Sequence, residues 1–251
     1  MNIITTALLA LLGTWTGSVL AAESPHAVTA NAGITTDYLY RGISRSSEDP
    51  AAQAGFEYAY RPLGLYTGVW GSSVEFDSLA SDSASFELDY YGGLRGAFAN
   101  GIEWDVGGVW YSFPGQDQDT AGDFDYAEAR GELGHRFSAL PLTPRVAVLG
   151  AWSPDFFGED GDGLYGAGSL DLSLPREFVL GFGVGHQYVD GDLSSGPSGY
   201  EYTHWRVGLS RRLLGLNLGL SYQDSPDEEE CGGDLCDERV VFSVSTALDA
   251  F

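Results

Sequence analysis

The feature that most constrains the fold of this chain is a two-residue alternation of side chains, repeated over most of its length. In Ala51–Arg61, for example, Phe56 and Tyr58 lie on one parity, and Glu57 and Arg61 on the other. Because alternate side chains of a β-strand point to opposite faces, the alternation predicts strands with one apolar and one polar face. Twelve strands are predicted: Val28–Tyr40, Ala51–Arg61, Leu65–Ser72, Phe86–Arg95, Ile102–Tyr111, Tyr126–Phe137, Pro144–Trp152, Leu164–Leu174, Phe178–Tyr188, Tyr200–Arg211, Leu214–Tyr222 and Arg239–Leu248.

The connections between these strands alternate between short and long. The short ones are Arg61–Gly64, Ala99–Gly101, Leu140–Pro144, Leu174–Glu177 and Arg211–Arg212. The long ones, mostly acidic, are Arg41–Pro50, Ser73–Ser85, Pro114–Asp125, Pro154–Asp162, Asp190–Gly199 and Asp224–Glu238. Short periplasmic turns opposite long outer loops are typical of outer-membrane barrels. The sequence therefore predicts an all-β fold, a single transmembrane antiparallel up-and-down barrel of about 12 strands, in which Pro114–Asp125 is the candidate for a loop that folds inward.

A soluble β-sandwich or barrel also alternates, and two features argue against it. A soluble barrel buries an apolar inner face, whereas the second face here carries many charges of both signs. Aromatic residues also gather near predicted strand ends, as in the aromatic belts of membrane proteins. The expected belt consists of Tyr38, Tyr40, Tyr58, Tyr60, Trp104, Trp110, Tyr188 and Trp205.

The N-terminal residues predict export. A short apolar run from Ile3 is followed by the small residues Ala21 and Ala22, which is typical of a secretory signal peptide. We expect residues 1–21 to be the signal peptide and residues 22–251 the barrel, with cleavage after Ala22 as the alternative. An uncleaved anchor helix is the other interpretation. Beyond residue 22, no apolar stretch approaches the roughly 18 residues of a spanning helix.

Charge and cysteine content limit the partners. The formal net charge is −24, and all 12 basic residues are arginines, which argues against nucleic-acid binding. In an exported protein, the two cysteines Cys231 and Cys236 predict a local disulfide. Two thiols alone make a poor zinc site, because structural zinc takes four Cys or His ligands. We expect no metal and no cofactor.

Several segments resemble the TorF family of proteobacterial porins. They are Thr35-Thr36-Asp37-Tyr38-Leu39-Tyr40-Arg41-Gly42-Ile43-Ser44 with Asp49-Pro50, Gly68–Ser72, Glu87–Gly92, Ser153–Gly158 and Arg239–Ser245. The resemblance covers nearly the whole mature chain and implies a channel in the outer membrane of a Gram-negative bacterium, without defining its solute. The partners expected there are outer-membrane lipid and lipopolysaccharide, the barrel-assembly machinery during biogenesis, and small hydrophilic solutes or ions.

The charged face of the strands is the candidate site. Its predicted pore-lining residues are Glu57, Glu87, Asp89, Arg95, Glu103, Asp105, Glu128, Arg130, Glu132, Arg136 and Arg206. With Asp37, Asp171 and Arg239 added, nine acids face five arginines. Carboxylate rings favour cations in a pore. The alternative is that ion pairs such as those of Glu128, Arg130 and Glu132 simply fill a narrow bore.

No catalytic residues are expected. The chain has no Gly-x-Ser-x-Gly elbow, and neither His135 nor His204 has an evident serine partner. The sequence therefore predicts a passive diffusion channel for small hydrophilic solutes with a mild preference for cations. The alternative is a non-conducting barrel that acts as a surface scaffold, an adhesin or a membrane-integrity protein.

Overall fold

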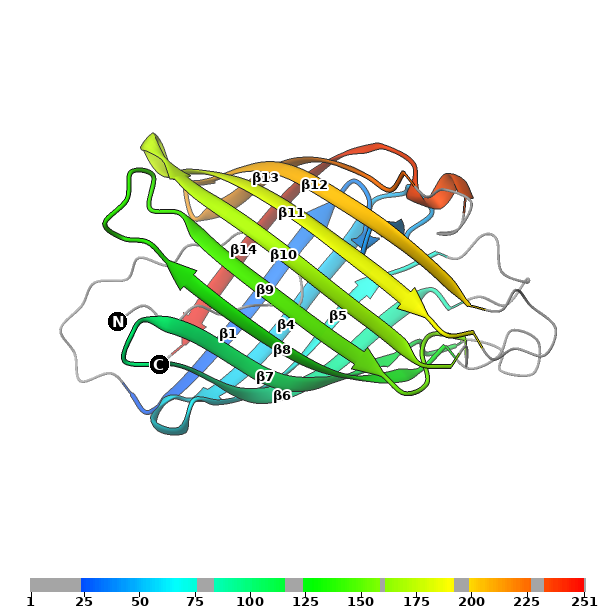
Figure 1. Ribbon diagram of the computed structural model, residues 1–251, viewed down its shortest axis with the longest axis horizontal. Coiled ribbons are helices and arrows are strands. Elements are labelled where there is room, and N and C mark those ends of the chain that lie inside the picture. Colours follow the sequence, from blue (N-terminus) through cyan, green and yellow to red (C-terminus); the bar gives the residue numbers. More distant parts are fainter. Residues whose placement is uncertain are drawn as a thin grey trace.

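The computed structural model describes residues 24–75, 84–115, 124–158, 161–191, 199–226 and 233–250. Within them, twelve antiparallel strands close into a barrel in the order β1-β14-β13-β12-β11-β10-β9-β8-β7-β6-β5-β4 (Figure 1). They are β1 His26–Thr35, β4 Ala51–Tyr60, β5 Leu65–Ser73, β6 Phe86–Ala97, β7 Ile102–Ser112, β8 Tyr126–Arg136, β9 Arg145–Ser153, β10 Gly163–Leu174, β11 Phe178–Val189, β12 Tyr200–Leu213, β13 Leu216–Asp224 and β14 Arg239–Ala250. The predicted all-β barrel and its strand number are confirmed.

The remaining elements are short. Two strands, β2 Leu39–Tyr40 and β3 Ile43–Ser44, pair only with each other and form a separate two-stranded sheet. Three single turns of 3₁₀-helix are η1 Arg61–Leu63, η2 Pro175–Glu177 and η3 Gly233–Cys236. In the part of the chain that the structure describes, no helix has the length and apolarity needed to cross a membrane.

The two ends of the barrel differ in the length of their connections. The short ones lie at one end, where β1 begins and β14 ends, and we call this the turn end (Figure 1). The opposite end is the loop end. The turn predicted at Arg211–Arg212 lies two residues further on, because Leu214 and Gly215 have the positive φ angles, 54° and 82°, that close a tight hairpin. β12 therefore continues to Leu213.

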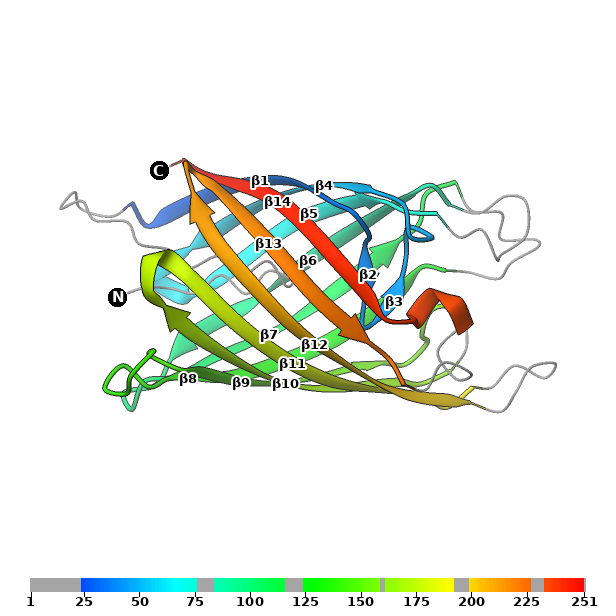
Figure 2. The same cartoon turned by 90° about the horizontal axis from the view of Figure 1, so that it is seen from above.

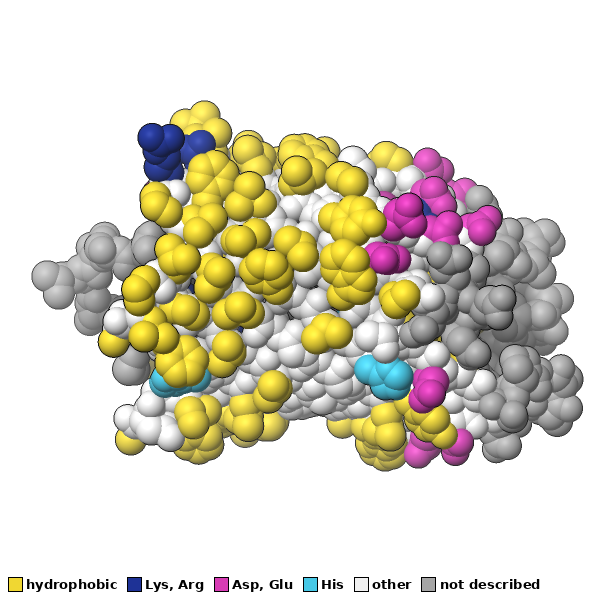
Figure 3. Space-filling view, turned by 45° about the horizontal axis from the view of Figure 1, so that its top comes forward, with side chains coloured by type: hydrophobic (Ala, Val, Ile, Leu, Met, Phe, Trp, Pro, Cys, Tyr) yellow, Lys and Arg dark blue, Asp and Glu magenta, His cyan; other side chains and the backbone are white. Residues whose placement is uncertain are grey.

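The outer face of the barrel is apolar and its inner face is polar. Val148 is 60% exposed, Val184 53% and Trp110 46%, whereas Glu87 and Asp89 are almost completely buried. A band of hydrophobic side chains covers the outer surface, and acidic side chains gather toward the loop end (Figure 3). Soluble monomers rarely expose so continuous an apolar surface. This distribution is the inverse of a soluble barrel, as the alternation of the sequence predicts.

One predicted strand is wrong in its second half. Val28–Tyr40 was expected to cross the barrel as one piece, but β1 ends at Thr35 and the chain then turns into the lumen. Figure 2 shows the β2–β3 hairpin inside the ring of strands, near the loop end. We call residues 36–50 the inner loop. Tyr38, only 4% exposed, is part of the interior and not of an aromatic belt on the outer surface, and Tyr40 lies beside it.

The turn into the lumen is held by hydroxyl groups. Ser44 Oγ donates a hydrogen bond to Asp37 Oδ1 at 2.6 Å, and Ser46 Oγ donates to the same oxygen at 3.0 Å. Thr35 Oγ1 donates to the carbonyl oxygen of Asp37 at 2.8 Å. The two serine bonds satisfy Oδ1 of this buried carboxylate, and the charge of Arg239, 3.5 Å from Oδ2, compensates the other oxygen.

Candidate functional site

Arg41, at the tip of the inner loop, joins three strands of the barrel wall. Its guanidinium forms a buried ion pair with Glu128 of β8 and donates a hydrogen bond to Gln187 Oε1 of β11 at 2.6 Å. The same group lies 4.1 Å from the ring centre of Tyr165 on β10, within the range of a cation–π contact. One side chain therefore holds the tip of the loop against the inner wall.

Arg45 anchors the inner loop a second time, on β6 and β8. Arg45 Nη1 lies 2.5 Å from Glu87 Oε1 of β6, and Nη2 donates to Tyr126 Oη of β8 at 3.0 Å. Tyr38 Oη also donates to Glu87 at 3.2 Å, and the guanidinium stacks 3.7 Å from the Tyr40 ring centre. Burial raises the pKa of the Tyr38 phenol, so this donor keeps its proton.

The opposite side of the barrel also contacts the inner loop. Arg239 Nη1 of β14 lies 3.5 Å from Asp37 and 3.0 Å from Glu48. Gly42 has φ +89°, and a Cβ there would lie 2.6 Å from His204 Cβ of β12. Glycine is therefore needed for both the backbone angle and the close approach. Because its contacts reach strands around the ring, the inner loop crosses the lumen and narrows it at the loop end.

Between the inner loop and the turn end, the inner faces of β4 to β9 carry further ion pairs. We call the inner faces of these strands the charged wall. Arg95 of β6 lies 2.7 Å from Glu57 of β4. Arg145 of β9 lies 2.9 Å from Glu132 of β8 and 3.2 Å from Glu103 of β7. Pairs of this kind stop charges in a narrow lumen from remaining uncompensated. They also draw these side chains against the wall.

The inner faces of β11 to β14 and β1 are built largely from small residues, and we call this region the small wall. Its members include Gly181, Gly183, Gly208, Ser210, Gly219, Ser221, Ser243, Ser245 and Gly33. A Cβ added at Gly183 meets no heavy atom within 4 Å. The lumen beside Gly183 is therefore open space.

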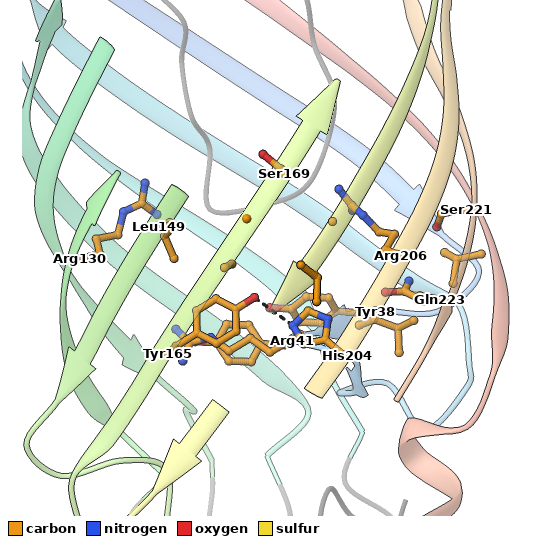
Figure 4. A pocket seen from close by; sticks show the side chains of 18 of the residues that line it. Tyr38, Arg41, Arg130, Leu149, Tyr165, Ser169, His204, Arg206, Ser221 and Gln223 are labelled. Carbon is orange, nitrogen blue, oxygen red and sulfur yellow. Dashed lines mark hydrogen bonds between the residues drawn. The ribbon is translucent and has the colours of Figure 1, made fainter. Parts of the chain in front are cut away.

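A cavity of about 340 Å³ lies beneath the inner loop, between the two walls (Figure 4). Arg130 reaches it from β8 and Arg206 from β12. Tyr165 and His204 form part of its lining and share a hydrogen bond of 2.9 Å between Oη and Nε2. Ser169, Ser221, Ser243, Gln53 and Gln223 add hydroxyl and amide groups to the lining. Besides apolar side chains such as Trp70 and Val241, the cavity therefore offers charged, hydroxyl and amide groups to a hydrated or hydroxylated solute.

The structure places five of the predicted site residues around the cavity, and most of the predicted glutamates pair with arginines that were not predicted. Asp89, Glu128, Arg130, Glu132 and Arg206 line the cavity. The predicted residues Glu57 and Arg95 pair with each other, whereas Glu87, Glu103, Glu128 and Glu132 pair with arginines outside the predicted set. Asp105 accepts a hydrogen bond from Tyr66 Oη at 2.6 Å. Arg136 shares the inner parity of β8 but does not line the cavity.

Sequence reasoning missed Arg41, Arg45 and Arg145. The first two were assigned to an outer loop, and the third was placed on a strand without a role. A usable signal was present, because the predicted inner face held more acids than arginines and a nearby loop carried two arginines among aromatic residues. That excess predicts a basic segment that folds inward.

Some predictions lie outside the described residues. These are the signal peptide at residues 1–21 and most of the Pro114–Asp125 loop that was considered for folding inward. Cys231 also lies there, so its disulfide with Cys236 stays a prediction. Cys236 itself, in η3, is fully buried.

Comparisons define the class of the protein. Residues 20–248 match the family described as "Bacterial protein of unknown function (Gcw_chp)", and the chain belongs to this family. No curated protein matches it.

The fold is also similar to that of solved outer-membrane channels. The KdgM porin, solved in complex with disordered oligogalacturonate, matches with a TM-score of 0.52 and 8% identity, covering 90% of this chain and 99% of that one. The NanC porin has a TM-score of 0.51 and 7% identity, with 89% and 98% covered. An outer-membrane channel from Pseudomonas putida F1 has a TM-score of 0.51 and 15% identity, with 90% and 94% covered. At these identities the similarity concerns the fold.

Proposed function

We propose that this protein is an outer-membrane channel for the passive diffusion of small hydrophilic solutes. The observation that carries the proposal is the inverted barrel, in which an exposed apolar band surrounds a polar lumen that contains a cavity. A spanning barrel needs such a band, because lipid contacts its outer face. The fold that it shares with KdgM and NanC supports the same conclusion.

The finer parts of the proposal follow from this location. We place the turn end in the periplasm and the loop end outside the cell, with lipopolysaccharide around the acidic outer rim. Residues 1–21 act as the export signal, and the barrel-assembly machinery inserts the chain. The resemblance of the segments quoted above supports the further proposal that the chain is a TorF-type porin.

A mild preference for cations is part of the proposal. It is based on the nine acids that face five arginines in the predicted lumen and on the net charge of −24. The inner loop and β9 contribute Arg41, Arg45 and Arg145 to the same space, which reduces the excess. We therefore expect a weak selectivity.

A second function is favoured by one observation. The inner loop crosses the lumen and is held by two buried ion pairs, as a plug would be. A barrel that stays plugged conducts nothing and acts through its outer surface as a scaffold, an adhesin or a membrane-integrity protein.

Single-channel current across a planar bilayer separates the two functions. The protein is refolded, its β-content is checked by circular dichroism, and its reversal potential is measured under a KCl gradient. Discrete steps with a small cation-selective reversal potential are the expected result. Folded and inserted protein that gives no steps would rule out the diffusion channel and leave the plugged scaffold.

A further inference from the structure

The charges that border the cavity are not equally available to a solute. On β8, the acids on either side of Arg130 along the inner face are both engaged by other arginines: Glu128 by Arg41, and Glu132 by Arg145. Among the described residues, no carboxylate oxygen lies within 4.0 Å of the Arg130 guanidinium. Arg130 therefore presents its charge to the cavity.

The other acids of the cavity are withdrawn from it. Asp89 is 1% exposed, and its Oδ1 is buried. Asp37 is held by Ser44, Ser46 and Arg239. The accessible charge beneath the inner loop is therefore positive, although the protein as a whole is strongly acidic.

The remaining lining is suited to hydroxyl groups. Arg206 enters from β12, across the cavity from β8, and Ser169, Ser221 and Gln223 point toward the same space (Figure 4). Gly183 adds no side chain, which leaves room between the two arginines. A guanidinium binds a carboxylate through two parallel hydrogen bonds, and hydroxyl and amide groups both donate and accept.

We propose that this cavity is a binding site for a small hydroxylated organic acid. The carboxylate binds Arg130, with Arg206 facing it, and the solute hydroxyls contact Ser169, Ser221 and Gln223. A volume of about 340 Å³ admits one molecule the size of a single sugar acid. This inference rests on the proposed function and names the solute class of the channel. The excess of acids over the whole lumen sets the weak preference for small cations, whereas the local positive charge of Arg130 and Arg206 selects the solute at the cavity.

Calorimetric titration of the refolded full-length protein in detergent tests the site without requiring current. Three probes of similar size and different charge are compared: gluconate, glucose and glucosamine. We expect gluconate to bind at least ten times more tightly than either of the others. Arg130→Gln is expected to weaken gluconate binding at least tenfold, whereas Arg136→Gln, on the same strand face but outside the cavity, leaves it unchanged.

Arg206→Gln provides an independent variant from the opposite wall if Arg130→Gln fails to fold, and it should also weaken gluconate binding. Wild-type protein that binds gluconate no better than glucose overturns the proposal, as does equal weakening by Arg136→Gln. The channel is tested separately. Gluconate binding without current steps supports the site and refutes the diffusion channel, whereas steps without gluconate binding refute the site alone.

Discussion

The two walls of the lumen use opposite chemistry. The charged wall holds its inner-face glutamates in ion pairs and also receives both anchors of the inner loop, at Glu87 and Glu128. The small wall carries many glycines and serines, and at Gly183 it borders open space. Both walls contact the inner loop, but the charged wall forms the two buried ion pairs that anchor it, whereas below the loop the small wall leaves space. The difference teaches that a narrow barrel can concentrate its ion pairs on one side and its open space on the other.

Physical chemistry explains the separation. A buried charge costs several kcal/mol unless it is paired, so the glutamates of the charged wall lie in ion pairs that fill space, and Arg130, which faces the open cavity, is an exception. Glycine and serine leave space without placing a charge there. A solute that passes the inner loop is therefore expected to travel along the small wall, with Arg130 and Arg206 on either side of its path.

Removing the inner loop should have the largest effect on the single-channel current. Replacement of residues 37–49 by a short Gly-Ser linker is expected to raise the single-channel current several-fold, because the loop crosses the lumen. Replacement of residues 192–198, in another of the long connections, by a Gly-Ser linker of the same length is the control and should leave the current largely intact. An unchanged current after the first replacement would show that the inner loop is not the narrowest point.

Blocking the passage should have the next largest effect. Gly183→Cys, treated with a bulky methanethiosulfonate reagent, is expected to lose more than half of its current, because the new side chain extends into open lumen. Gly150→Cys is the matched control. A Cβ there also meets no heavy atom within 4 Å, but Gly150 lies on the outer face of β9. If the reagent reduces the current equally at both positions, the solute does not pass along the small wall.

The anchors of the inner loop should contribute strongly to stability. Arg45→Ala leaves the fully buried Glu87 without its partner, and we expect it to lower the free energy of unfolding by about 3 kcal/mol. The double variant Arg45→Ala with Glu87→Gln should recover part of this loss, because no uncompensated charge remains. Urea unfolding in lipid vesicles, followed by tryptophan fluorescence, measures both. Additive losses would mean that the pair is not coupled.

The sequence predicts well which residues line the two walls, but it does not predict that the inner loop enters the lumen. Strict alternation places Glu57, Glu87 and Glu128 on the inner face, because parity along a strand is a local property. The inner loop is different. Tyr38 and Tyr40 continue the alternation of β1, so the two-residue pattern predicts a strand that runs past Thr35. In the structure the chain has already turned into the lumen there.

The ion pairs that anchor the inner loop cannot be predicted from residues that are close in the sequence. Arg41 and Glu128 are separated by 87 positions along the chain, and Arg45 and Glu87 by 42. A sequence contains no spacing rule for such pairs, since they depend on which loop enters the lumen. The acid excess of the predicted inner face was the available clue, because buried carboxylates need partners.

The smallest effects should come from the small wall itself. Ser221→Ala and Ser243→Ala each remove one hydroxyl from a surface that borders the cavity, and we expect the free energy of unfolding to change by less than about 0.5 kcal/mol. Arg95→Ala is the comparison on the charged wall. It leaves Glu57, 6% exposed, without its ion pair and should cost more than either serine variant. The same urea titration measures all three. If a serine variant proves as costly as Arg95→Ala, the small wall also holds the barrel together, and the difference between the two walls is lost.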